Sequence, residues 1–393
     1  FVKADTSNWY NYNNKEWANI VLVSDTVREK YNSALEGTQI LESDVLAYYV
    51  WIPRYKYQIF ANVNNIQVGI DYNTNNAKII NIKFESKNTT KSTGSTLNSW
   101  LTHPAFTFGS EELDGIWVGK FEITGSTTTP TIKPNVTSLR NLNVSTFFTT
   151  SRKLNYGTIR DTSIIKNIEW GAVAYLTSSK YGQGLNEVRI NNSSTYTTGC
   201  AATVKPGASN LIGYYNLQTN HTIGYYNGCE NAYNTTIGVL ASTTGNISGI
   251  YDMSGGAWEY VMGVMESSLG SNVPMTKQSG FTTFPESKYY DIYKYGTTDN
   301  DISAYSRGHL GDATKELTGF SSKVDIDKVN RPHSSWNQDY SFFISDSFPF
   351  FVRSGGYENG AASGIFTFSL TTGVGYFYYN SSYSYFSTRV VLR

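Results

Sequence analysis

Short apolar runs separated by polar sequence limit what this chain can fold into. The longest run, VLAYYVWI at 45–52, has the length of a strand and is far below the roughly 18–20 residues that a membrane-spanning helix needs. Other runs with the aromatic and β-branched residues of strands are found at 77–86, 115–125, 348–357, 363–370 and 383–392. We therefore predict a β-rich fold and no insertion of this segment into a membrane.

Two segments have the apolar spacing of helices. We predict one helix over 144–155 and a second over 163–180, with Asp161 or Ser163 as its N-cap and Gly182 as its stop. The run at 77–86 alternates instead, with Ile79, Ile80, Ile82 and Phe84 as its expected apolar set. Long polar stretches at 183–248 and 266–340 are predicted to be irregular insertions of the kind that often carries function.

The polar surface of this chain is predicted to be poor in charge. Charged side chains make up 16% of the 393 residues, against about 25% in ordinary soluble domains. Asn, Ser, Thr and Tyr replace them, which is typical of extracellular β-rich proteins. The formal net charge is zero, so no basic surface is expected to follow a phosphate backbone. We predict an extracellular protein that does not bind nucleic acid.

The only two cysteines, Cys200 and Cys229, both stand in sequence rich in Gly, Asn, Ser and Thr. Such sequence favours loops, and a disulfide that closes a loop of this length adds roughly 3–4 kcal/mol of stability in the chain-entropy model. We predict this disulfide and an oxidising compartment. The alternative is two unrelated free thiols.

The N-terminal segment differs in composition from the rest. Aromatic runs on both sides of Asn13 and Asn14 predict a hairpin within 9–23, and polar, helix-compatible sequence follows. We predict residues 1–44 to be a small β module or the end of a stalk, and 45–393 to be the main domain. The chain begins without Met, as a mature or trimmed fragment does. If residues 1–44 are the end of a stalk, a stalk, pilus or tail-fibre partner is expected there.

Several motifs, taken in order, resemble one known family. VWIPRYKY (50–57), GIWVGKFEITG (115–125), NIEWGAVAYL (167–176) and GIYDMSGGAWEY (249–260) resemble the formylglycine-generating-enzyme (sulfatase-modifying-factor) branch of the C-type-lectin fold. Four residues near the C-terminus support this resemblance: Arg353, Gly355, Gly356 and Arg389. The resemblance implies an α+β, C-type-lectin-like fold over 45–393, with two main helices and long irregular insertions.

The same series is similar to retroelement-diversified ligand-binding proteins of gut bacteria and their prophages. In those proteins the C-terminal segment varies between copies, which implies a variable segment here at about 335–388. This resemblance implies a protein displayed on a bacterial surface, a pilus-like structure or a phage particle. Fold resemblance alone does not fix function.

The residues for the family's oxidase chemistry are missing from this sequence. Copper-dependent members use a cysteine pair in the C-terminal segment, but no cysteine follows Tyr357. Iron-dependent members need clustered histidines, whereas the four histidines here are scattered: His103, His221, His309 and His333. We therefore predict a protein that is not an enzyme and requires no cofactor.

The resemblance also implies a structural calcium site in the DMSGGAWE turn. Its ligands would be Asp252, Gly255, Ala257 and Glu259, because relatives use two carbonyls and two oxygen side chains at these places. The alternative is that Asp252 and Glu259 only accept hydrogen bonds from backbone amides of the turn.

The C-terminal segment has an unusual composition. Seven of the eleven residues of YFYYNSSYSYF (376–386) are aromatic, and no charged side chain occurs from Asn359 to Thr388. Tyr, Ser and Asn are the residues of antibody-type binding loops, because a Tyr ring gives large contact area at low entropic cost. The alternative is that the rings pack in the core, as expected of Ile365, Phe366 and Phe386.

We predict that this segment forms the binding site of a ligand-binding or adhesion protein, whose ligand is a surface protein or a glycan. The candidate residues are Tyr357, Asn359, Phe368, Thr371, Thr372, Tyr376, Phe377, Tyr378, Tyr379, Tyr383 and Tyr385, with Trp336 and Tyr340 beside them. Two other functions stay open: a structural surface or phage-tail subunit that uses the aromatic patch for assembly, and a residual metal-dependent enzyme.

Overall fold

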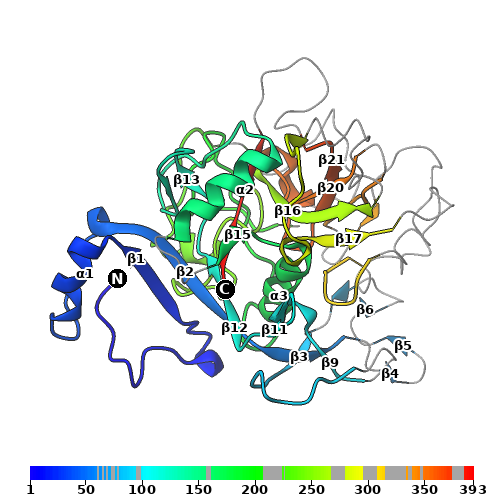
Figure 1. Ribbon diagram of the computed structural model, residues 1–393, viewed down its shortest axis with the longest axis horizontal. Helices are drawn as coiled ribbons and strands as arrows, with labels where there is room; N and C mark the ends of the chain where they lie inside the picture. The colour runs from blue at the N-terminus through cyan, green and yellow to red at the C-terminus, as the bar shows by residue number, and fades with distance from the viewer. Residues whose placement is uncertain are drawn as a thin grey trace.

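The three-dimensional structure is a computed structural model of the chain (Figure 1). It describes residues 1–59, 79–93, 99–155, 161–206, 226–266, 279–294, 308–314, 339–345, 348–373 and 385–393, together with Gly224 and the short strand pieces 62–63, 66–67, 70–71, 76–77 and 333–334. Within these residues the fold is a mixed arrangement of helices and several sheets, which agrees with an α+β class.

A five-stranded antiparallel sheet joins the two ends of the chain. Its order is β1 (Asn19–Val23), β2 (Val45–Pro53), β12 (Gly115–Gly119), β23 (Val390–Leu392) and β15 (Thr162–Ile164). The predicted strand runs at 45–52, 115–125 and 383–392 thus form sheet strands. Because β23 lies inside this sheet, the C-terminus is fixed in the middle of the fold.

A second sheet has seven strands and surrounds β16 (Trp258–Met265), which is buried along its whole length. Its order is β17 (Asp291–Tyr293), β16, β20 (Phe350–Arg353), β21 (Phe368–Thr371), β19 (Tyr340–Ser341) and β18 (His333–Ser334), with β22 (Phe386–Thr388) paired in parallel to β16. β21 and β22, which both lie within the uncharged stretch from Asn359 to Thr388, therefore belong to this sheet.

The remaining strands form small sheets. A three-stranded sheet joins β8 (Asn81–Phe84), β3 (Tyr55–Gln58) and β9 (Leu101–Thr102). Four two-stranded ladders join β4 (Asn62–Val63) to β5 (Ile66–Gln67), β6 (Ile70–Asp71) to β7 (Asn76–Ala77), β10 (Thr107–Phe108) to β11 (Glu111–Glu112), and β13 (Thr124–Gly125) to β14 (Pro130–Thr131).

The expected apolar set of the 77–86 run is only half right. Ile80 and Ile82 are buried, but Ile79 is 45% exposed and Phe84 is 37% exposed. Adjacent residues of a strand point to opposite faces, so Ile79 cannot share the core face of Ile80. Phe84 ends β8 at the surface.

Both predicted helices are present, with shifted ends. α2 covers Val144–Arg152 and α3 covers Asn167–Thr177, while a further helix, α1, covers Asp25–Asn32. Short 3-10 helices occur at η1 (Tyr12–Asn14), η2 (Glu42–Asp44), η3 (Pro104–Phe106), η4 (Lys153–Asn155), η5 (Gly238–Ala241), η7 (Ser287–Tyr289) and η10 (Tyr357–Ala362), the last kinked at Gly360. Among the described residues, no helix has the length and apolar character needed to cross a membrane.

The predicted caps of the second helix are wrong. Asp161 and Ser163 cannot cap it, because the chain forms β15 at this place and turns into α3 only at Asn167. The Glu169 carboxylate accepts the Lys166 backbone N–H at 2.8 Å and so closes the first turn. The helix ends at Thr177, five residues before the predicted stop at Gly182.

α3 lies between the two large sheets (Figure 1). Every residue of α3 is buried, and the helix contacts β2 of one sheet and β16 of the other. Its polar backbone and indole groups find partners in the core: the Tyr55 hydroxyl donates to Ala172 O at 2.7 Å, and the Trp170 indole donates to Ile365 O at 2.8 Å. The helix therefore ties the sheets into one core.

The N-terminal segment contacts the main domain through β1. Asn19 pairs with Val50, and the buried Lys120 ammonium donates to Asn19 Oδ1 at 2.7 Å. The hairpin predicted within 9–23 is reduced to one antiparallel bridge, between Asn11 and Glu16, that closes over η1. The strand that was expected to complete the hairpin pairs with β2 instead, because β2 offers a long apolar edge.

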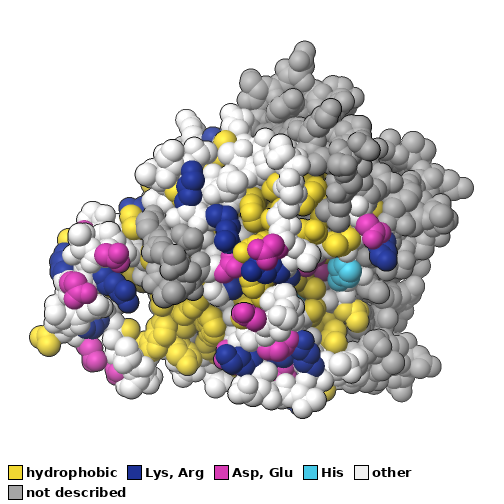
Figure 2. Space-filling view, viewed as in Figure 1, with side chains coloured by type: hydrophobic (Ala, Val, Ile, Leu, Met, Phe, Trp, Pro, Cys, Tyr) yellow, Lys and Arg dark blue, Asp and Glu magenta, His cyan; other side chains and the backbone are white. Residues whose placement is uncertain are grey.

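One face of the five-stranded sheet is only half covered. Figure 2 shows apolar side chains gathered between α1 at the left edge and the charged groups in the centre, over β2 and β12 of Figure 1. Trp51 and Trp117 are paired across β2 and β12 and are half-buried, with ring centroids 4.9 Å apart. On the opposite face Val50, Ile52 and Val118 are completely buried.

Candidate functional site

The DMSGGAWE turn (252–259) makes hydrogen bonds to the loop before Cys200 and to Tyr357, the segments that form the rest of the candidate site. Asp252, Gly255 and Gly256 all have positive φ, of 60°, 76° and 74°. A Cβ on Gly256 would lie 2.7 Å from Glu122 Oε1, so a side chain at this position would displace a buried carboxylate. The turn therefore brings its backbone unusually close to neighbouring segments.

The Asp252 carboxylate holds the loop that contains the cysteines. Its Oδ1 accepts the Asn191 side-chain amide at 2.8 Å and the Gly199 backbone N–H at 2.8 Å. Gly256 N–H in turn donates to Asn191 O at 2.8 Å. Asp252 is 1% exposed, so these protein groups, rather than solvent water, satisfy its buried carboxylate.

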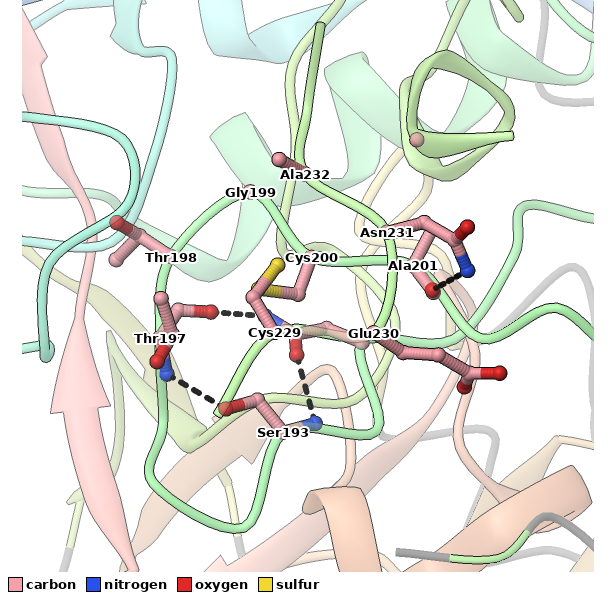
Figure 3. The surroundings of a disulfide bond; sticks show 12 residues. Ser193, Thr197, Thr198, Gly199, Cys200, Ala201, Cys229, Glu230, Asn231 and Ala232 are labelled. Carbon is pink, nitrogen blue, oxygen red and sulfur yellow. Dashed lines mark hydrogen bonds between the residues drawn. A yellow bond between two sulfur atoms is a disulfide. The ribbon is translucent and has the colours of Figure 1, made fainter. Parts of the chain in front are cut away.

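The predicted disulfide closes the same loop (Figure 3). The sulfur atoms of Cys200 and Cys229 lie at bonding distance, 2.04 Å. Around them the Asn231 side chain donates to Ala201 O at 2.9 Å, and Thr197 N–H donates to the Ser193 hydroxyl at 3.0 Å. The disulfide and these bonds fix the loop on both sides of Tyr196.

Three tyrosines from different segments meet beside the turn. The rings of Tyr196 and Tyr357 are in edge-to-face contact with centroids 5.0 Å apart, and the Arg140 guanidinium lies 3.8 Å above the Tyr196 ring. Burial raises the pKa of the Tyr196 hydroxyl; the nearby Glu358 and Tyr357 raise it further, Arg140 lowers it, and Tyr385 has a smaller raising effect. We call these five residues the tyrosine cluster.

The backbone of Tyr196 is strained at its position in the tyrosine cluster. Its φ is 56°, in the left-handed region that a bulky residue rarely adopts. The neighbouring Tyr357 is held by its own backbone N–H, which donates to Gly256 O at 2.9 Å. Strain of this kind persists where the surrounding structure enforces it, and it is concentrated at functional sites.

Tyr385 of the tyrosine cluster stands at one end of the segment between Gly373 and Tyr385, which lies within the uncharged stretch. Trp258 N–H donates to Tyr385 O at 2.8 Å, directly before β22. At the other end, Val144 N–H of α2 donates to Gly373 O at 3.2 Å. Both ends of the segment are therefore anchored in buried structure.

Some predicted contact residues lie outside the described part of the chain. These are Trp336, Tyr376, Phe377, Tyr378, Tyr379 and Tyr383. Of the others, Tyr340 is half-buried, with its ring 6.2 Å from Trp258. Asn359 is half-buried as well, and its Oδ1 accepts Gly356 N–H at 2.7 Å, so it fixes the start of η10.

Three predicted contact residues are buried. Phe368 is completely buried, 6.0 Å from the Phe351 ring and 5.3 Å from the Arg353 guanidinium. Thr371 and Thr372 are each 6% exposed. Phe368 therefore belongs to the core, because it lies on the inner side of β21. The expected core residues Ile365, Phe366 and Phe386 are buried as predicted.

The four residues of the expected calcium site face protein donors. Asp252 is bound as described above, and Glu259 Oε1 lies 2.6 Å from Arg389 Nη2. The Ser354 hydroxyl donates to Gly255 O at 2.7 Å and lies 3.3 Å from Ala257 O. In this arrangement the residues do not fit a calcium ion, because the hydroxyl occupies the point where the two carbonyls converge. The contacts also differ from the alternative of backbone amides of the turn, because Asp252 accepts from Asn191 and Gly199 outside the turn and Glu259 contacts Arg389.

Buried charge around the turn is unbalanced. Glu122, Asp252 and Glu259 are buried carboxyls, and Arg389 is the cation that contacts Glu259. Burial raises the pKa of Glu122, and the charges of Asp252 and Glu259 raise it further. Burial also raises the pKa of Glu259 to about 7, although Arg389 acts in the opposite direction. The pKa of Glu122 therefore lies well above that of an ordinary carboxyl, because burial and the two neighbouring carboxylates both disfavour its charged form.

No cluster of three or more His, Cys, Asp or Glu side chains suited to a metal ion occurs in the described ranges.

Sequence reasoning missed Tyr196, Arg140 and Glu358. The one signal that could have found Tyr196 is its place four residues before Cys200, directly ahead of the loop that the disulfide closes.

In comparisons with known proteins, no family model matches this chain, and no curated protein matches it.

Proposed function

We propose that this chain is a non-enzymatic, extracellular ligand-binding or adhesion protein with a C-type-lectin-like fold. Its ligand contacts the tyrosine cluster and the uncharged C-terminal segment that ends at Tyr385. The ligand is a surface protein or a glycan of another cell, and the protein is displayed on a bacterial surface, a pilus-like structure or a phage particle.

One observation carries this proposal: a strained Tyr196 is held against Tyr357 at the end of an uncharged aromatic segment. Long-range contacts enforce this geometry, from Asp252 to Gly199 and from Gly256 to Tyr357. Tyr196 itself is 7% exposed, whereas Tyr357 and Tyr385 are half-buried, so the tyrosine cluster reaches the surface through the latter two rings. Rigid aromatic side chains that are fixed before binding are characteristic of binding loops, because little side-chain freedom is then lost on association.

The order of the segments supports the C-type-lectin-like fold. The family-like runs become β2 and β3, β12, α3, the DMSGGAWE turn, and β20 with β23. Diversification of about 335–388 is a further part of the proposal. A near-identical template repeat and a reverse transcriptase gene in the neighbouring DNA would support it, and their absence would count against it.

The binding experiment compares the wild type with a Tyr196→Ser/Tyr357→Ser double variant on arrays of glycans and bacterial surface proteins. Tyr226→Ser is the matched control, because Tyr226 lies in the neighbouring loop between Cys200 and Cys229, is 44% exposed and makes no ring contact among the described residues. We expect the double variant to lose the strongest wild-type signals, at least about tenfold, and the control to keep them. Equal binding by both variants would exclude the tyrosine cluster.

The two rival functions give different results in the same preparation. An assembly subunit would self-associate, and the Tyr196→Ser/Tyr357→Ser variant would dissociate it. A residual enzyme would retain stoichiometric copper or iron after purification. Either result would replace the binding function with another.

A further inference from the structure

The chain contains two Asn-Gly sequences, and the structure places them in opposite surroundings. Asn227-Gly228 lies directly before Cys229, whereas Asn359-Gly360 lies in η10 beside Tyr357. An Asn that precedes Gly can deamidate spontaneously, because the next backbone nitrogen attacks its side-chain carboxamide and Gly has no Cβ to hinder that approach. The side chain and the backbone must both rotate for the attack, so the folded structure decides which Asn reacts.

The side chain of Asn227 is not held in place. Asn227 is exposed, and within the described part of the chain neither its carboxamide nor the backbone N–H of Gly228 makes a hydrogen bond. A Cβ placed on Gly228 would have no atom within 4 Å, so there is open space around this residue. Rotation of the Asn227 side chain onto the Gly228 nitrogen therefore breaks no hydrogen bond that the structure shows.

Asn359 is the opposite case. Its Oδ1 accepts the Gly356 N–H at 2.7 Å, and its own backbone N–H donates to Gly356 O at 3.0 Å. The following Gly360 is buried, and its carbonyl accepts the Ser363 N–H at 3.0 Å. Attack by the Gly360 nitrogen would first have to break such bonds, which costs free energy before any covalent step. The fold therefore protects Asn359.

We propose that Asn227 is a site of spontaneous deamidation in the folded protein. The Gly228 nitrogen loses its proton to solvent and forms a bond to Asn227 Cγ, while the Cγ–Nδ2 bond breaks and ammonia leaves. The product is a cyclic succinimide, which water then opens at one of its two carbonyls. Opening at Cγ's former backbone partner, the main-chain carbonyl, gives isoaspartate, and opening at the peptide bond to Cγ gives ordinary aspartate.

Isoaspartate at this position would disturb the segment that leads to Tyr196, because it adds one carbon to the backbone. On one side the chain is fixed by the disulfide at Cys229. On the other side the Tyr226 N–H donates to Asn192 O at 3.0 Å, and Tyr226 O accepts the Ser194 N–H at 2.9 Å. The extra backbone atom lies between these two fixed points, so the hydrogen bonds of Tyr226 have to absorb it.

The test compares the two Asn-Gly sequences in the same wild-type molecules. The folded protein is kept in mildly alkaline buffer, which speeds ring closure because it removes the proton from the attacking nitrogen. Peptide mapping by mass spectrometry follows the conversion of each amide to an acid, and labelling by an isoaspartate methyltransferase identifies isoaspartate. A reduced sample unfolded in guanidinium chloride is the control for sequence, and Asn227→Gln is the control for the assignment, because ring closure from Gln is slower.

We expect Asn227 to deamidate at least about tenfold faster than Asn359 in the folded protein, and the two to react at similar rates in the unfolded chain. In the isoaspartate form, hydrogen exchange at Ser194 and Tyr226 should be faster than in fresh protein. Three outcomes would overturn the proposal: Asn227 keeps its amide in the folded protein, it reacts no faster there than Asn359, or the same difference between the two persists in the unfolded chain. Unchanged exchange at Ser194 and Tyr226 would overturn the effect on the loop. None of these results depends on a ligand, so the proposed binding function is tested separately.

Discussion

The backbone N–H of Gly199 donates to both carboxylate oxygens of Asp252, at 2.8 and 3.1 Å. This pair joins the DMSGGAWE turn to the disulfide loop, although 53 residues separate the two in sequence. Through this pair of hydrogen bonds, the DMSGGAWE turn, which resembles a motif of an enzyme family, helps to position the segment that carries Tyr196.

Substitution of Asp252 should loosen that loop. In Asp252→Ala, two buried donors from Asn191 and Gly199 lose their acceptor, and Ala is strained at a φ of 60°. We expect a loss of about 3 kcal/mol in the free energy of unfolding by urea, with faster hydrogen exchange at Gly199. Asp252→Asn keeps one acceptor and tolerates the positive φ, so its loss should be about 1 kcal/mol. An Ala variant as stable as the wild type would contradict this role.

Calcium should have no effect on stability. The Ser354 hydroxyl contacts Gly255 O and Ala257 O, where a bound ion would need to lie. We expect the same melting temperature in excess calcium and in a calcium chelator. A rise with calcium that follows mass action would show that the turn rearranges to bind the ion. Ser354→Gly, which frees both carbonyls, is the informative variant if such a rise occurs.

Removal of the Arg389 side chain should strongly lower the stability of the fold. Its guanidinium contacts Glu259 at 2.6 Å and donates to Gly119 O and Tyr251 O, each at 2.8 Å, all in the buried interior. Arg389→Met leaves Glu259 without its cation, so we expect a loss of about 3–5 kcal/mol in the free energy of unfolding. The double variant Arg389→Met/Glu259→Gln should recover part of it. No recovery would show that the two backbone acceptors dominate the loss.

The protein should become less stable as the solution becomes alkaline. Burial raises the pKa of Glu358 to about 7, and it also raises that of Asp339. Between the ordinary carboxyl range and these raised values, the folded state holds protons that the unfolded state has lost, so the free energy of unfolding falls as pH rises. We expect the melting temperature to fall from about pH 5 to about pH 8.

The pH profile has an internal control. Glu112 and Glu230 are partly exposed carboxyls whose pKa values are lowered. Contacts with Lys91 and Arg54 lower the pKa of Glu112, and contacts with Thr203 and Asn192 lower that of Glu230. The stability that these two carboxylates add to the folded state is therefore lost only under more acidic conditions. In the Glu358→Gln variant, the melting temperature should fall less steeply above about pH 5, and its change with pH under acidic conditions should stay as in the wild type. A melting temperature that rises steadily to pH 8 in the wild type would contradict these assignments.

Local sequence patterns were sufficient for several elements of this fold. The apolar runs predicted β2 and β12, helical spacing predicted α2 and α3, and loop composition predicted the disulfide. These features depend on neighbours a few residues away. The caps of α3 failed, because β15 forms only when β23 is available to pair with it.

The tyrosine cluster could not have been predicted as a unit. Tyr196, Tyr357 and Tyr385 belong to three distant segments, and their meeting depends on Asp252 and Gly256, whose contacts cross the fold. Phe368 was predicted as a contact residue because its segment is aromatic and free of charge, but in β21 it packs into the core and is completely buried. Composition indicated a binding segment without telling which rings face outward.

The most direct measurement of the central claim is the binding of the Tyr196→Ser/Tyr357→Ser variant to the ligands that the wild type captures from arrays of glycans and surface proteins. Thermal unfolding must first show that the variant is folded. The account predicts that binding falls at least about tenfold while Tyr226→Ser binds like the wild type. A folded double variant that binds as tightly as the wild type would contradict it.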